Sequence, residues 1–230
     1  MSIQENIDLF FGWIRDRRKE IDHLPRKCRL SSELYRRILL LSLLDTLSKC
    51  AFPNESKNRK RFVKLIDCHA DWKYKDYVNL PQLQYLLKRS ACTDLRKEVE
   101  NRVNKWRKGT TLRPEEADVS IHELDNFKCS KCEDLIEKAR YPSLLWRMRN
   151  VAVHEFRRPG RGMAAISNDH STPYVHGSLE LNGSHSWEFY VPSEVISQIA
   201  KKCSENLEVD LKRKCYDPYD SFCYGSSWYP

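Results

Sequence analysis

The chain has 230 residues, with 40 Lys and Arg against 32 Asp and Glu and a formal net charge of +8 at pH 7. Its content of 40% hydrophobic and 11% aromatic residues is enough to build a core, which excludes wholesale disorder. Only 7 glycines argue against a Gly-rich nucleotide-binding fold and against a loop-rich all-β protein. The positive charge favours an anionic partner, nucleic acid first, although evenly spread charge is also typical of an ordinary soluble surface.

Neither a secretory signal nor a membrane span is expected. No basic region precedes the short apolar run at 7–14, and no small-residue cleavage site follows it. The most hydrophobic segment, 38–47, contains Ser42 and Asp45 and is about half the length needed to cross a bilayer. The 9 cysteines are an odd number without regular spacing. A cytoplasmic protein with reduced thiols is therefore the simplest interpretation.

The first part of the chain is predicted to be helical. Residues 3–20 have an amphipathic pattern, and residues 57–72 place apolar side chains at helical spacing. Between them, residues 33–50 predict a longer helix whose segment 38–44 is apolar nearly all round. That pattern is typical of a central buried helix.

The middle of the chain is predicted to be an insertion. Residues 93–108 predict a helix with so many charges that a solvated face is expected, and residues 114–127 give no clear pattern. We therefore expect a charged helical insertion at 73–129, packed on a core formed by about 1–72 and 130–214.

The last part of the chain mixes helices with a hairpin. Helices are predicted at 130–140 and from Pro142 to about residue 156. Residues 174–181 and 187–191 are β-like and flank a turn signal, Asn-Gly-Ser, which predicts a hairpin.

A last helix at 193–214 and an irregular aromatic tail at 215–230 complete the chain. The expected fold class is mainly α, a helical bundle with a late β-hairpin and a C-terminal helix, in a single domain.

The most informative segment is the helix predicted over 144–156. Arg147, Asn150 and His154 stand at i, i+3 and i+7 and so share one face, which Arg157 or Arg158 continues. Arg149 lies about 140° round the helix from His154. Both side chains can therefore reach a groove alongside the helix, but not one point directly above it. An Arg and a His at a helix end can also simply cap carbonyls and complement the helix dipole.

The run from Arg149 to His154, Arg-Asn-x3-His late in a basic helical chain, resembles the motif of the HEPN superfamily. The setting is similar too, because a long apolar helix at 33–50 precedes the motif helix. The resemblance implies an HEPN-like helical bundle that cleaves RNA without a metal or other cofactor, as a homodimer with one composite cleft. It looks most like stand-alone bacterial toxins or defence effectors, for which a protein antitoxin or inhibitor is a possible partner.

The resemblance also implies roles for individual residues. His154 would serve as general acid or base, and Arg149 would bind the phosphate and the transition state. Asn150 would hold the imidazole or the substrate. Phosphate positioning falls to three further residues, Arg147, Arg157 and Arg158.

Two other functions stay open at this point. One is a catalytically inactive HEPN-like module that binds RNA, a nucleotide or a protein, and the other is an unrelated helical nucleic-acid-binding regulator. In one branch of the family a modified Tyr stands two places after the His, where this chain has Phe156. Control by that modification is therefore in doubt. If the nuclease interpretation holds, positive potential should concentrate at the dimer cleft, around His154 and Arg161.

The remaining metal candidates are weak. Cys129 and Cys132 have zinc-ligand spacing, but no second such pair exists, and His122 is the nearest additional ligand. Structural thiols are the favoured interpretation. The three histidines near the hairpin have no metal-ligand spacing and are expected to be solvated in loops: His170, His176 and His185.

Asp45 is unusual because it stands within an apolar helix, where a carboxylate needs a partner. We expect a structural role, with Arg147 or Arg149 as possible partners, or a place in a surface groove. The aromatic residues of the tail are expected to dock on the fold or on a dimer partner rather than to stack on bases.

Overall fold

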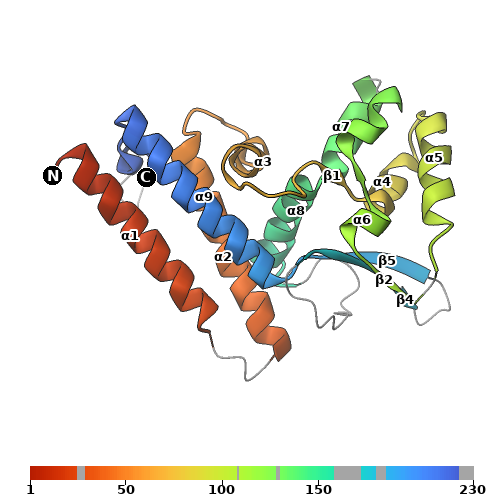
Figure 1. Cartoon of the computed structure of the whole chain (residues 1–230), viewed down its shortest axis with the longest axis horizontal. Coiled ribbons are helices and arrows are strands. Elements are labelled where there is room, and N and C mark those ends of the chain that lie inside the picture. The colour runs from red at the N-terminus through yellow and green to blue at the C-terminus, as the bar shows by residue number, and fades with distance from the viewer. Residues whose placement is uncertain (25–28, 108, 128–129, 158–171, 180–184, 223–230) are drawn as a thin grey trace. The chain divides into compact units, whose positions relative to one another are not determined.

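The chain is mainly α-helical with a small antiparallel sheet and a C-terminal helix, which confirms the expected fold class (Figure 1). The computed structural model describes residues 1–24, 29–107, 109–127, 130–157, 172–179 and 185–222. Within these residues no helix is long and apolar enough to cross a bilayer. The chain divides into two compact units, Met1–Trp72 with Ile196–Pro230 (unit 1) and Lys73–Val195 (unit 2).

Unit 1 is built from long helices. They are α1 (Ile3–Asp22), α2 (Arg29–Ala51), α3 (Asn58–His69) and α9 (Ser193–Lys214), followed by the 3-10 helix η2 (Pro218–Ser221). Phe11 on α1, Leu44 on α2 and Leu207 on α9 are fully buried. α2 is less uniformly buried than its sequence predicts, because Leu39 is 43% exposed.

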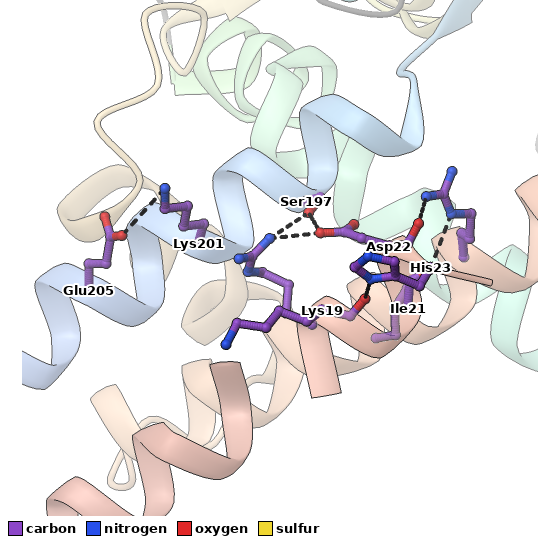
Figure 2. A network of polar contacts seen from close by, with 9 residues as sticks. Lys19, Ile21, Asp22, His23, Ser197, Lys201 and Glu205 are labelled. Atoms are coloured by element: carbon purple, nitrogen blue, oxygen red, sulfur yellow. Dashed lines mark hydrogen bonds and ion pairs between the residues drawn. The ribbon is translucent and has the colours of Figure 1, made fainter. Parts of the chain in front are cut away.

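The end of α1 is fixed to α2 and α9 by a polar network (Figure 2). The Asp22 carboxylate accepts hydrogen bonds from Arg18 (2.7 Å) and from the Ser197 hydroxyl on α9 (3.0 Å). Arg36 on α2 is buried and donates to the backbone carbonyls of Ile21 and Asp22. These bonds satisfy carbonyls that the last turn of a helix leaves unpaired.

The part of the aromatic tail that the structure describes docks on unit 1. The rings of Tyr219 and Phe222 lie 5.7 Å and 6.2 Å from the ring of Phe10 on α1. The docking on the fold expected for the tail is confirmed for these two residues, while residues 223–230 lie outside the described chain.

Asp45 pairs with Arg61 on α3, at 3.7 Å, and Arg61 also donates to the Ser48 hydroxyl at 3.2 Å. This ion pair supplies the partner that a carboxylate in an apolar helix needs. A structural role for Asp45 is thus supported within unit 1, and a bond to Arg147 or Arg149 stays a prediction.

Unit 2 combines short helices with short strands. In chain order they are β1 (Tyr77–Val78), α4 (Leu80–Leu87), α5 (Thr93–Val103), β2 (Thr111–Leu112), α6 (Pro114–Ala117), β3 (Val119–Ser120), the 3-10 helix η1 (Ile121–Phe127), α7 (Ser130–Ala139), α8 (Tyr141–His154), β4 (Tyr174–Leu179) and β5 (His185–Tyr190).

The predicted hairpin is present. β4 and β5 pair in antiparallel register from Tyr174 opposite Tyr190 to Leu179 opposite His185. The described strands of this sheet follow the order β2-β4-β5, so β5 is an edge strand. His176 and His185 lie in the strands themselves, which corrects their expected place in loops, and His170 lies outside the described residues.

Several helices from the middle of the chain share a buried core within unit 2, and the insertion expected at 73–129 stays a prediction. Leu83 on α4, Leu95 and Val99 on α5 and Ile136 on α7 belong to one buried cluster. Leu95 and Val99 form an apolar stripe at i and i+4 among the charges of α5, and this stripe faces the cluster. The segment after Trp72 therefore packs with α7 and α8 in unit 2.

A disulfide joins Cys92, just before α5, to Cys132 in the first turn of α7. This corrects the expectation that the thiols are reduced. The pairing depends on the fold, since 40 residues of chain separate the two cysteines. Cys50 and Cys203 are buried free thiols, and burial raises the pKa of Cys50 to about 12. Such thiols are unreactive at neutral pH.

Candidate functional site

α8 carries the candidate residues, and its sequence explains its position. Pro142 stands in the first turn, where its missing N–H costs nothing. Its side chains from Tyr141 to Trp146 are all buried, so the first half of the helix is a core element. Arg147 is the first exposed residue along the helix, and His154 ends it.

The start of α8 is anchored by a buried carboxylate. Tyr141 donates its hydroxyl hydrogen to Asp118 (2.6 Å), which also accepts from the backbone N–H of Leu80 (2.8 Å) and from the Asn79 amide (3.0 Å). Asp118 thus joins the first turns of α4 and α8. Burial raises the pKa of Asp118 to about 6, with the three donors opposing that rise.

Arg140, just before α8, reinforces this anchor. It donates to the Glu137 carboxylate (2.9 Å) and to the carbonyl oxygen of Lys75 (3.3 Å), and its side chain is only 11% exposed. Neither Asp118 nor Arg140 stands out in the sequence. Asp118 lies in the segment without a recognisable period, and its partners are up to 39 residues away.

The end of α8 brings Arg149, Asn150 and His154 together. Nη1 of Arg149 lies 3.2 Å from Nε2 of His154 and 3.2 Å from Oδ1 of Asn150. A guanidinium can only donate, so Nε2 of His154 is the acceptor when this contact is a hydrogen bond. The long arginine side chain spans the angle between its own position and that of His154.

Asn150 contacts Arg149 in this arrangement. Its expected contact with the imidazole or the substrate stays a prediction. The Arg149 guanidinium also lies over the ring of the buried Trp146, 5.1 Å from its centroid. A cation over the face of an indole is attracted by the ring. Two neighbours therefore fix Arg149 while its Nη1 points to His154.

The other predicted phosphate-positioning residues have different outcomes. Arg147 is exposed and makes no ion pair within the described residues. Arg157 is exposed and pairs with Glu155 at 2.6 Å. Arg158 and Arg161 lie outside the described residues, so the predicted concentration of positive charge is described only in part.

Phe156 follows the helix end with a positive φ of 52° and is 61% exposed. This left-handed conformation is disfavoured for a residue with a Cβ and is usually taken by glycine after a helix. Strained backbone of this kind often occurs at functional sites. The sequence draws attention to Phe156 only for its missing hydroxyl, not for its conformation.

The zinc candidates do not come together. Cys132 is bonded to Cys92, Cys129 lies outside the described residues, and His122 is exposed. Among the residues that the structure describes, no group of three or more His, Cys, Asp or Glu side chains could hold a metal ion.

The end of α8 therefore brings together an exposed imidazole and a partly exposed guanidinium and amide. These groups can accept a proton and bind a phosphate. No protein-family model, no curated protein and no solved structure matches this chain.

Proposed function

We propose that the chain is a metal-independent endoribonuclease of HEPN type. The observation that supports this proposal best is the 3.2 Å contact between Arg149 Nη1 and His154 Nε2 at the exposed end of α8. It unites a proton acceptor and a phosphate-binding cation in the residues that resemble the HEPN motif. The proposed substrate is single-stranded RNA.

The proposed chemistry uses His154 as general base. A neutral imidazole can take the proton of a ribose 2′-OH at Nε2 once substrate displaces the Arg149 donor. The 2′ oxygen then attacks the adjacent phosphorus and the bond to the 5′ oxygen breaks, which leaves a 2′,3′-cyclic phosphate. Arg149 binds the phosphate oxygens and offsets the charge of the transition state.

The leaving 5′ oxygen needs a proton from a second group. In the proposed homodimer His154 of the second copy supplies it, because the ends of the two α8 helices meet at a two-fold axis. The proposal extends to a toxin or defence role with a protein inhibitor. The Cys92–Cys132 disulfide argues against a permanently reducing compartment.

Incubation of purified protein with single-stranded RNA in EDTA tests the proposal. We expect cleavage that survives chelation, 2′,3′-cyclic ends, and a loss of rate of at least about 100-fold in Arg149→Ala and His154→Ala. Two exposed residues outside the motif provide matched controls, His122→Ala and Arg213→Ala, which should cleave normally.

Cleavage that is equal in the site variants and in the controls would contradict the proposal, as would cleavage that stops in EDTA. Intact RNA with measurable binding would assign the chain to the inactive RNA-binding modules instead.

A further inference from the structure

A pocket of about 500 Å³ opens beside the candidate site, entirely within unit 2. α4, α8 and the edge strand β5 form its walls. On α8 it is lined by Arg147 and Val151, which share a helix face with His154. This volume falls in the range of pockets that bind small organic groups.

The walls of the pocket suit a flat apolar group. Met148 and Val151 contribute aliphatic surface, and the Tyr85 ring on α4 is 65% exposed at the rim. Across from them, the Trp187 ring lies over Gly177, where a Cβ would approach it to 2.9 Å. The rings of Trp106 and Trp187 pack edge to face, with centroids 5.0 Å apart. A planar ring could therefore stack here on aromatic side chains.

The pocket also offers hydrogen bonds that the described protein does not use. The Nε2 atom of Gln82 is buried and donates no hydrogen bond within the described residues. Such an unsatisfied donor is unfavourable, so an acceptor from a ligand would be stabilising. Among the described strands β5 pairs with β4 alone, so part of its backbone between Ser186 and Phe189 faces away from that ladder at this wall.

Charged side chains of both signs line the pocket. Glu188 disfavours an anion beside its carboxylate. Arg147 and Arg157 also line it, and both are exposed. The arrangement fits a neutral ring with amino and carbonyl groups inside and a phosphate outside.

The pocket lies beside the motif along α8. Arg147 and His154 are seven residues apart on one helix face, about 10 Å along the axis, with Val151 between them. A ring held against Val151 leaves a phosphate attached to it within reach of Arg149 and His154.

We propose that this pocket binds one nucleobase of the RNA, next to the phosphate that is cleaved. Tyr85 and Trp187 stack on the base, Gln82 donates to an acceptor on its edge, and Arg147 holds the neighbouring phosphate. This inference rests on the proposed ribonuclease function and adds a source of base preference to it.

Binding and cleavage are measured separately to test it. The full-length His154→Ala protein is titrated with labelled single-stranded RNA oligomers of each base, and with an oligomer that is abasic at one position. We expect unequal affinities for the four bases and weaker binding of the abasic oligomer. Tyr85→Ala should lower the affinity for the preferred base roughly 10-fold and leave the abasic oligomer unaffected.

Gln82→Glu is the sharper variant, because it keeps the shape and replaces the donor with an acceptor. It should change the order of preference among the bases, which a purely structural role would not do. Gln84→Ala on the same helix and the exposed Tyr35→Ala in unit 1 are matched controls and should bind normally. In the protein with His154 intact, Tyr85→Ala should raise KM and leave kcat within about 2-fold. This is expected because the lost stacking stabilises the bound substrate and the transition state equally.

The outcomes distinguish this inference from the proposed function. Equal affinity for abasic and normal oligomers overturns the pocket, and so does cleavage with unchanged KM and base preference in Tyr85→Ala and Gln82→Glu. A third outcome is that the protein never cleaves RNA but binds it with a base preference that Tyr85→Ala abolishes. This outcome would support base binding in the pocket and contradict the proposed ribonuclease function.

Discussion

The two ends of α8 differ in how their polar groups are satisfied. At the first turn, Tyr141 is fully buried and bonded to Asp118, and Arg140 is paired with Glu137. At the other end, Arg147 and His154 are exposed, and His154 is bonded only to another member of the motif within the described residues. One helix therefore combines a fixed buried anchor with an end whose groups can exchange partners.

This difference assigns separate tasks to the two ends. A buried hydrogen-bonded network determines the position of a helix, because each of its members loses much free energy when left unpaired. Exposed groups contribute little to stability and can instead contact a ligand. Substitutions at the first turn should therefore change the free energy of unfolding, and substitutions at the last turn should change activity.

The largest effect on stability is expected for Asp118→Ala. The substitution leaves the Tyr141 hydroxyl, the Leu80 N–H and the Asn79 amide without their acceptor, at about 1–3 kcal/mol each. The free energy of unfolding should fall by about 5 kcal/mol in urea denaturation. As a control, Asp134→Ala removes an exposed carboxylate that pairs with Lys138 on the surface of α7, and it should cost less than about 1 kcal/mol. Equal losses in the two variants would contradict the anchor.

Reduction of the Cys92–Cys132 disulfide should have the next largest effect. The bond closes a loop of about 40 residues through the core that supports α8. Loop-closure entropy predicts that this disulfide contributes about 4 kcal/mol to the free energy of unfolding. Thermal unfolding should shift to lower temperature with dithiothreitol, and Cys132→Ala without reductant should show the same shift. The double variant Cys50→Ala and Cys68→Ala tests whether free thiols explain the effect. Its stability should still fall on reduction.

The pH dependence of stability gives a third test of the anchor. Because the pKa of Asp118 is raised from 3.8 to about 6 by burial, the folded state binds a proton more tightly than the unfolded state. The stabilisation by protonated Asp118 is complete only below the unfolded pKa of 3.8 and is lost as the pH rises through 6. Between pH 4 and 7 the free energy of unfolding relative to Asp118→Asn should fall by about 2 kcal/mol. A constant difference would show that Asp118 is ionised throughout.

The elements with a local pattern could be predicted from the sequence. α8 and α9 are both close to their expected bounds because their apolar periods and start signals are contained in the segments themselves. The β4–β5 pairing followed from alternation around a turn signal. The contribution of α5 to the buried cluster was not predicted, because Leu95 and Val99 stand among many charged residues in the sequence.

The candidate site was predictable only in part. The helix period places Arg147, Asn150 and His154 on one face, but the side-chain contact of Arg149 with His154 depends on its length and on Trp146 beneath it. Asp118 and Tyr141 meet across 23 residues, and no local pattern marks such a pair. The positive φ of Phe156 could not be predicted from the sequence either, because the residue that follows a helix in this conformation is usually glycine and rarely aromatic.

The smallest expected effect concerns the backbone at the exposed end of α8. Phe156→Gly should relieve the cost of the left-handed conformation and stabilise the protein by about 1 kcal/mol relative to Phe156→Ala, which removes the ring but keeps the Cβ. Cys215 in unit 1 has a similar φ of 51° after α9, so Cys215→Gly against Cys215→Ala measures the same cost where no function is proposed. Urea denaturation gives both differences, and RNA cleavage gives their functional counterpart. If Phe156→Gly cleaves as slowly as a site variant while Phe156→Ala is normal, the fixed backbone after His154 is required for catalysis. If both variants cleave normally, the strain at Phe156 only ends the helix, as it does at Cys215, and the contrast between the two ends of α8 lies in the side chains alone.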